Sequence, residues 1–321
     1  MHPRIHSGAI AVIAAAVQAL ACNPERGESR GAPGASPTEA PARGAAGDGA
    51  EIAPAPAPAP APAPSARDAL ILRVGDGEPL GFLRTVLETL GFQVRELMVG
   101  GEGDPPPPGA VLILADPGAG PIEPALALVD RHLAAGGAAL IALEPRAGAS
   151  LGPLERRLGL RMEIVPIADE QAHLQRRGDE TDHGIVATDL VTPHATTASM
   201  TGRSRSVLLF MESGSLSEID PPPAGATRIV TVRSMSTAFA DVDRDHRRGA
   251  GEEMRSHAIA AVVALEAPGG RAVVTADASW LGDDVQRNVP SMQLLARDVM
   301  DWLTGAHALT APRSSPGTGA R

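Results

Sequence analysis

Ser150 is the residue whose setting most resembles a catalytic nucleophile. Gly148-Ala149-Ser150-Leu151-Gly152 matches G-x-S-x-G, the turn that holds the reactive serine of many hydrolases. That turn needs its serine directly between a strand and a helix, whereas here Pro145 and the next residues intervene. Asp277 and His307 stand in the usual chain order of the other triad members, but His307 lies beyond the last expected helix. We therefore expect no catalytic residue, and a secreted serine hydrolase using Ser150 stays an alternative.

A second pattern could hold a metal ion. Asp241, Asp243, Asp245 and Glu252 occupy positions 1, 3, 5 and 12 of a calcium-binding loop. Position 6 of such a loop is glycine, and here it is His246. We favour a solvated acidic loop neutralised by its arginines and expect no metal or other cofactor, while calcium binding stays open. Those arginines are Arg244, Arg247 and Arg248.

Two aspartates follow apolar runs of strand length, and ligands of open α/β sheets bind at the carboxyl ends of strands. Asp116 and Asp277 could therefore line the pocket of a small-ligand sensor, although a carboxylate that caps the next turn is the simpler interpretation. His173, His183 and His194 do not have the spacing of a helix-borne zinc motif.

Composition excludes several classes of protein. The chain has 321 residues, a net charge of −10, no Tyr, and no Lys among its 28 basic residues. Without Lys it cannot build the phosphate-binding loop of an ATPase, a kinase site or a Schiff base. One Cys excludes an internal disulfide and a Cys-based zinc site. The acidic balance and 2% aromatic content argue against a nucleic-acid partner.

The single cysteine ends a secretory leader. Residues 1–22 have a basic start, an apolar stretch too short to span a bilayer, and the ending Ala19-Leu20-Ala21-Cys22. Small residues before Cys22 resemble a bacterial lipobox, which predicts that Cys22 is the lipid attachment site. We therefore expect a lipid-anchored protein of the bacterial cell envelope that faces the periplasm or the exterior. Ordinary leader cleavage beside a bystander cysteine is the alternative.

Low-complexity segments surround one folded domain. Residues 23–67 are rich in Ala, Pro and Gly and include six Ala-Pro repeats at Ala53–Pro64, which favour an extended spacer of roughly 37 Å. Residues 306–321 are a second Pro/Ser/Gly-rich segment, expected to be disordered like the first.

Between them, residues 68–305 alternate short apolar runs with amphipathic helices. This alternation predicts an α/β fold, a three-layer sandwich with a mostly parallel sheet. Strands are expected at 69–74, 92–98, 110–115, 138–143, 161–167, 206–211, 227–232, 258–265 and 271–276. Helices are expected at 80–90, 121–135, 151–158 and 290–304, and 168–205 is expected to be irregular.

The order of several short motifs adds a resemblance. They include Glu144-Pro145, Thr192-Pro193-His194, Thr275-Ala276-Asp277-Ala278-Ser279-Trp280-Leu281 and Asp301-Trp302-Leu303-Thr304-Gly305. With the strands between them, they resemble the extracytoplasmic domain of the auxiliary component of gliding-motility-type ABC transporters, the GldG-like family. The domain is also similar to flavodoxin-like and class I glutamine-amidotransferase-like sandwiches. An amidotransferase activity is excluded because the only cysteine, Cys22, lies in the leader.

The resemblance implies an auxiliary, partner-binding role rather than an enzymatic one. This chain has a lipobox where the family has membrane helices. The expected partners are therefore the membrane, through the lipid, and a protein of the envelope such as an ABC transporter subunit. The serine hydrolase and the small-ligand sensor remain the alternatives.

Overall fold

The computed structural model describes residues 67–74, 80–99, 106–107, 109–115, 121–145, 150–201, 206–266 and 269–305. The expected leader with Cys22, nearly all of the expected linker, Asp116, His307 and the expected tail lie outside the described residues. Within the described ranges, no helix is long and apolar enough to cross a membrane.

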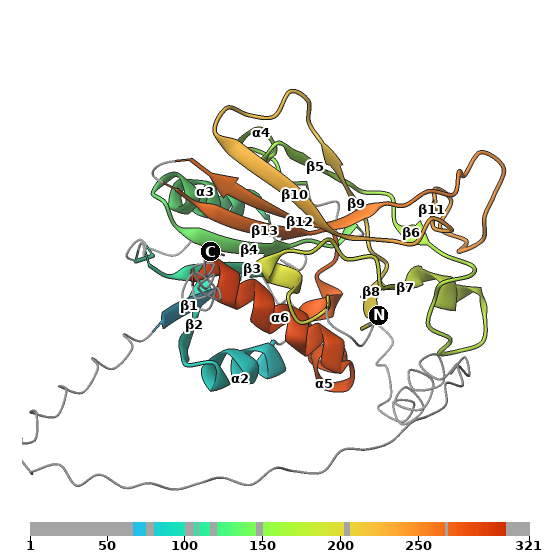
Figure 1. Ribbon diagram of the computed structural model, residues 1–321, viewed down its shortest axis with the longest axis horizontal. Helices are drawn as coiled ribbons and strands as arrows, with labels where there is room; N and C mark the ends of the chain where they lie inside the picture. The colour runs from blue at the N-terminus through green and yellow to red at the C-terminus, as the bar shows by residue number, and fades with distance from the viewer. Residues whose placement is uncertain are drawn as a thin grey trace, which may run out of the picture.

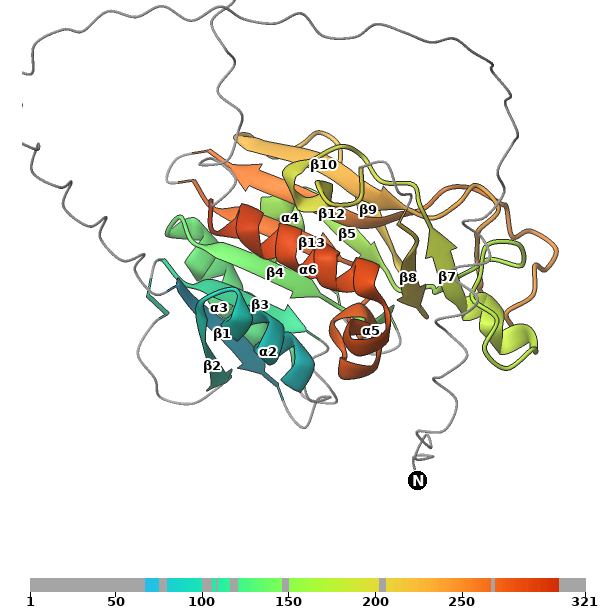
Figure 2. The same ribbon diagram turned by 60° about the horizontal axis from the view of Figure 1, so that its bottom comes forward.

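A nine-stranded sheet runs through the domain (Figure 1 and Figure 2). Its order is β2-β1-β3-β4-β13-β12-β9-β5, and β10 also pairs with β12. The strands are β1 (Arg67–Arg73), β2 (Phe92–Met98), β3 (Val111–Ala115), β4 (Ala138–Ala142), β5 (Leu160–Glu163), β9 (Ser215–Glu218), β10 (Ala226–Arg233), β12 (Ala258–Leu265) and β13 (Arg271–Thr275). The strands from β2 to β13 in this order are parallel, and β12, β10, β9 and β5 extend the sheet through antiparallel pairs.

The inner parallel strands β3, β4 and β13 are largely apolar on both faces, which is why both faces are covered by helices. Alternate residues of one strand enter different cores: Leu112 and Leu114 of β3 pack on one side of the sheet, and Val111 and Ile113 pack on the other. All five residues of β3 are buried.

Helices cover the two faces and complete three layers (Figure 1). On one side lie α3 (Glu123–Ala134) and α4 (Leu154–Leu158), and on the other lie α2 (Gly81–Thr89), α5 (Asp283–Asn288) and α6 (Pro290–Leu303). This arrangement confirms the expected α/β fold class.

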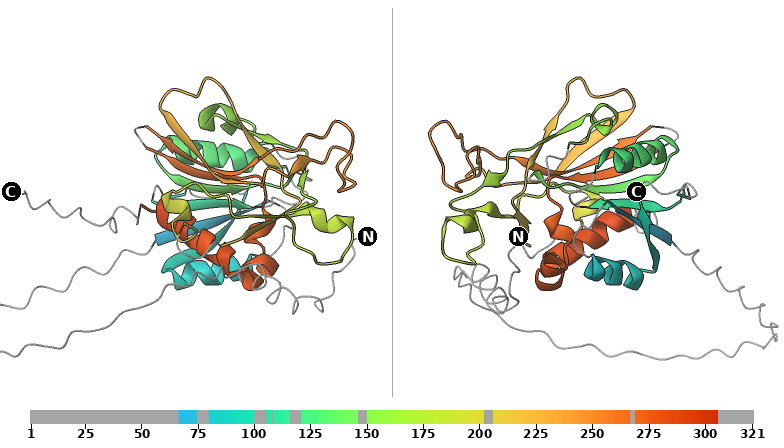
Figure 3. Two further views of the ribbon diagram at one scale, coloured as in Figure 1. Left: turned by 45° about the vertical axis from the view of Figure 1, so that its right-hand side comes forward. Right: turned by 180° about the vertical axis from the view of Figure 1, so that it is seen from behind.

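A small lobe lies at the side of the sheet away from β1 and β2 (Figure 1 and Figure 3). It contains the pairs β6 (Ile167–Ala168) with β11 (Phe239–Ala240) and β7 (Ile185–Thr188) with β8 (Leu208–Met211), and the short helical turn η3 (Glu180–Gly184). A second short turn, η4 (Ala195–Thr197), packs against α6 instead. The expectation that 168–205 has no regular structure is therefore wrong for β7.

The strand expected at 161–167 is also divided. β5 ends at Glu163 and β6 begins at Ile167, with Pro166 between them. Proline has no N–H to donate to a ladder, which accounts for the break. The carbonyl of Pro166 instead accepts from Asp241 N, at 2.8 Å, and so joins this segment to the residues after β11.

Candidate functional site

Two buried carboxylates, Glu144 and Asp277, follow the adjacent parallel strands β4 and β13. They are 1% and 0% exposed. Glu144 Oε1 accepts from Ala278 N at 3.1 Å and from Ser279 N at 2.7 Å. Asp277 accepts from Met211 N at 2.7 Å and from Ser279 Oγ at 2.6 Å. These bonds hold the start of the turn η5 (Ser279–Leu281) against the sheet, as the capping interpretation of Asp277 requires.

Burial raises the pKa of Asp277 to about 6, against the opposing effect of the hydrogen bonds from Ser279, Met211 and Trp280. A raised pKa can mark a functional site, but structural networks produce it too. Here the donors that surround the carboxylate belong to the fold itself, and Asp116, the other expected pocket residue, lies outside the described residues. Asp277 therefore stabilises the turn that follows β13, and it does not line the pocket found among the described residues.

Ser150 lies in an exposed stretch before α4. Its Oγ accepts a long hydrogen bond, 3.3 Å, from Gly152 N. No described histidine or carboxylate is hydrogen-bonded to this hydroxyl, and the Asp277 oxygens bind other donors. Within the described residues, the three members of the candidate triad are thus not brought together.

The acidic loop brings three of its four expected residues together. Carboxylate oxygens of Asp241, Asp243 and Glu252 lie within 4.8 Å of one another. Asp245 turns away, and its Oδ1 accepts from Arg247 N at 2.8 Å. Asp241 accepts from the backbone of His246 at 3.1 Å. Glu252 accepts from Val242 N and Gly249 N, at 2.7 and 2.6 Å.

His246 explains how this loop turns without the glycine of a calcium loop. Its φ is +60°, the left-handed conformation that position 6 requires. Its Nδ1 lies 3.3 Å from Asp241 Oδ2. Of the arginines expected to neutralise the loop, Arg247 pairs with Glu180, and Arg248 Nε donates to the backbone carbonyl of Glu252 rather than to a carboxylate. Backbone N–H groups donate to Asp241, Asp245 and Glu252, and calcium binding stays an open prediction.

The three histidines of the middle segment do not form one cluster. The rings of His173 and His183 meet edge to face at 4.7 Å, whereas His194 packs against Trp302 at 5.4 Å. Among the described residues, the group whose side chains could hold a metal ion does not include these histidines.

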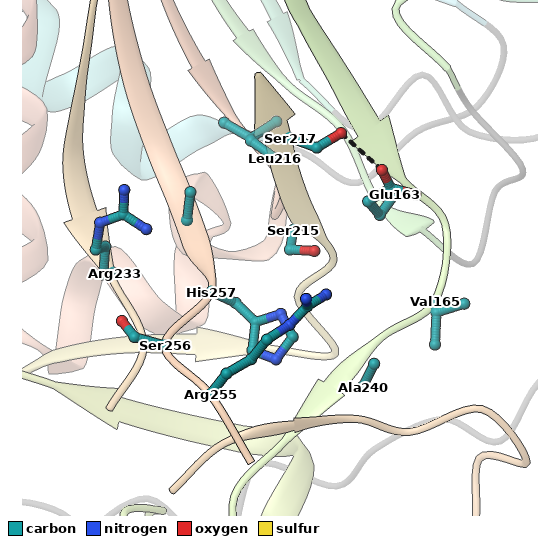
Figure 4. Close-up of a pocket in the computed structure, with 11 residues that line it drawn as sticks. Glu163, Val165, Ser215, Leu216, Ser217, Arg233, Ala240, Arg255, Ser256 and His257 are labelled. Carbon is teal, nitrogen blue, oxygen red and sulfur yellow. Dashed lines mark hydrogen bonds between the residues drawn. The ribbon is translucent and has the colours of Figure 1, made fainter. Parts of the chain in front are cut away.

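A pocket of about 400 Å³ lies where β5, β9, β10 and β12 approach the β6–β11 pair (Figure 4). Its polar lining comprises Glu163, Ser215, Ser217, Arg233, Arg255, Ser256 and His257, and its apolar lining comprises Val165, Leu216, Ala240 and Ala258. The sequence analysis named none of these residues. They come from separate strands and have no common spacing, so no motif signals them.

Three exposed apolar residues lie close in sequence to residues that line this pocket. Ile164, Val242 and Met254 are 53%, 70% and 44% exposed. Ile164 stands between two lining residues, Met254 precedes Arg255, and Val242 follows Ala240 by two positions. Hydrogen bonds join the three segments: Asp241 N donates to Pro166 O, and Arg255 N donates to Ala238 O, both at 2.8 Å. We call Ile164, Val242 and Met254 the apolar rim.

Comparisons with known proteins support the fold and do not assign a function. No family model matches the chain, and no curated protein does. Among solved structures, it is similar to one titled mmIFT52 N-terminal domain, with a TM-score of 0.52, 13% identity, and coverage of 74% of this chain and 97% of that one. It also matches a putative ThuA-like protein from Bacteroides uniformis, with a TM-score of 0.38, 11% identity, and coverage of 76% and 95%. At these identities, the first likeness concerns the fold alone.

Proposed function

We propose that this chain is a non-enzymatic lipoprotein of the bacterial cell envelope, whose α/β domain docks a membrane-protein partner in an ABC-type transport or gliding-type assembly. The observation that carries the docking role is the apolar rim. The lipobox-like sequence that ends at Cys22 and the GldG-like motif order support the envelope setting and the kind of partner.

The apolar rim is suited to contact with another protein. Soluble proteins scatter single apolar side chains over their surface, whereas neighbouring exposed ones mark interaction sites. Burying one such side chain completely is worth roughly 1.5–3 kcal/mol, so burial of the rim against a partner would favour association. The three residues lie in loops, and backbone hydrogen bonds such as Asp241 N to Pro166 O and Arg255 N to Ala238 O hold these loops together before binding.

The test is a comparison of two double variants of the full chain, expressed in the source cells and cross-linked before solubilisation in detergent. Ile164→Ser/Met254→Ser removes two members of the rim. Met98→Ser/Leu294→Ser removes two exposed apolar residues of β2 and α6 and serves as the matched control. We expect the wild type and the control to capture the same envelope partner, an ABC transporter subunit, and the rim variant to lose at least tenfold of it. Equal capture by both variants, or repeated absence of such a subunit, would refute the proposal.

A further inference from the structure

The pocket beside the apolar rim has the dimensions of a small-molecule site. Its volume of about 400 Å³ falls within the range of ligand pockets, roughly 300–1,000 Å³. Val165, Leu216 and Ala240 supply apolar wall, and three serine hydroxyls supply hydrogen-bonding groups. Such a lining suits an organic molecule with polar substituents.

The pocket carries an excess of positive charge in a chain whose net charge is −10. Arg233 and Arg255 line it, against one carboxylate, Glu163. Neither arginine side chain makes a hydrogen bond or an ion pair with any described residue, whereas Glu163 accepts from Ser217 Oγ at 2.7 Å. Figure 4 shows the two guanidinium groups among the lining side chains. Guanidinium groups bind carboxylates through two parallel hydrogen bonds, so a carboxylate matches this lining.

His257 supplies a buried nitrogen without a partner. The residue is 4% exposed, and no described group is hydrogen-bonded to its Nε2. Its backbone N–H donates to Ser234 Oγ at 2.8 Å, which fixes its position in the wall. Burial, and then the charge of Arg255, lower its pKa to about 4, so the ring is neutral at pH 7. A buried polar atom left unpaired costs roughly 1–3 kcal/mol, which a ligand oxygen bound to Nε2–H would recover.

We infer that this pocket binds a small organic anion that carries carboxylate groups, held by Arg233, Arg255 and His257. Phosphate fits the lining less well. Phosphate sites use free backbone amides at helix N-termini and in loops. Here the backbone N–H groups of the loop residues Arg255 and His257 already donate to Ala238 O and Ser234 Oγ. This inference rests on the pocket alone and does not depend on the docking role.

The test is calorimetric titration of the full chain, purified in detergent, with citrate, malate and succinate, and with phosphate and glucose as contrasts. We expect at least one carboxylate to bind, and Arg233→Ala/Arg255→Ala to weaken it at least tenfold. Arg95→Ala, which removes an exposed arginine from the far edge strand β2, should bind as the wild type does. Glu163→Gln should bind the anion more tightly, because it removes a repelling charge and still accepts from Ser217.

Three results would each overturn the inference. The first is the absence of binding by all three carboxylates, and the second is equal binding by the double arginine variant. The third is binding of phosphate or glucose as tight as that of the best carboxylate. A circular dichroism spectrum and melting temperature that match the wild type establish that the double variant is folded. No partner protein takes part in the titration, so its result is independent of the cross-linking experiment on the apolar rim. Failure of either experiment therefore leaves the other proposal standing.

Discussion

Complete burial and hydrogen bonding act on Asp277 in opposite directions. Met211, Ser279 and Trp280 donate to its carboxylate, which favours the charged form. Removal from water favours the neutral form, and it dominates, because the pKa is raised to about 6 from an ordinary 3.8. Above pH 6 the folded protein therefore keeps a buried charge that the unfolded chain would hydrate.

Asp277→Asn removes this buried charge, so the free energy of unfolding of the variant should depend on pH differently from that of the wild type. The group is protonated in both states below pH 3.8, and as the pH rises the unfolded chain ionises first. The wild type should therefore lose roughly 3 kcal/mol of unfolding free energy between about pH 4 and pH 6, relative to the variant. Urea unfolding of both proteins at several pH values measures the difference. If it stays constant with pH, the raised pKa is wrong.

At the scale of elements, burial determined which predictions succeeded. β1, β3, β4 and β13 were anticipated because strands covered on both faces are apolar throughout. β9 was missed because Ser215-Leu216-Ser217-Glu218 has only one large apolar residue, and its pairing with β5 and β12 depends on distant chain. The parallel strands, together with β5, β10 and β12 of the antiparallel extension, were thus readable from local pattern, whereas β9 was not.

The candidate functional residues also fall into two groups, those that local spacing reveals and those that only the fold brings together. Asp241, Asp243 and Glu252 could be named from spacing because one loop carries them. The pocket combines Glu163, Ser215, Arg233 and His257, which only the assembled sheet brings together. No local pattern could have found it, since each residue alone is an ordinary strand or loop residue.

The end of α3 shows why two glycines follow it. Gly136, at φ +88°, takes the left-handed conformation that ends many helices. Gly137 is required for space: a Cβ there would lie 2.2 Å from His132 Nε2. His132 is 5% exposed, and its Nε2–H donates to Ala110 O at 2.9 Å, which joins α3 to the start of β3.

Gly137→Ala should therefore displace the His132 ring and destabilise the fold by about 1–3 kcal/mol, the usual cost of overpacking. Gly109→Ala is the matched control, because a Cβ at Gly109 meets nothing within 4 Å. Thermal unfolding of both variants measures the effect. Equal melting temperatures would contradict the close packing of Gly137 against His132.

At the scale of the whole molecule, both ends of the described domain lie on one side. Arg67, the first residue of β1, pairs with Asp301 near the end of α6 at 3.9 Å. The lobe with β6, β7, β8 and β11, next to the pocket and its apolar rim, lies toward the opposite side (Figure 1 and Figure 3). A linker that enters at Arg67 would therefore leave the proposed docking surface facing away from the point of attachment.

Cys22→Ser tests whether that attachment is a lipid. If Cys22 is acylated, wild-type protein in the source cells should incorporate labelled palmitate and sediment with membranes, whereas the variant should lose the label and most of the membrane-bound fraction. The physical reason is that stable anchoring needs more than one acyl chain or a second membrane signal. No described helix is long and apolar enough to anchor the protein by spanning the bilayer. Deleting Ala53–Pro64 provides the contrast: it should leave labelling intact and shorten the reach of the domain by roughly 37 Å. Membrane association that persists at the wild-type level without label would mean that this protein is held through other contacts.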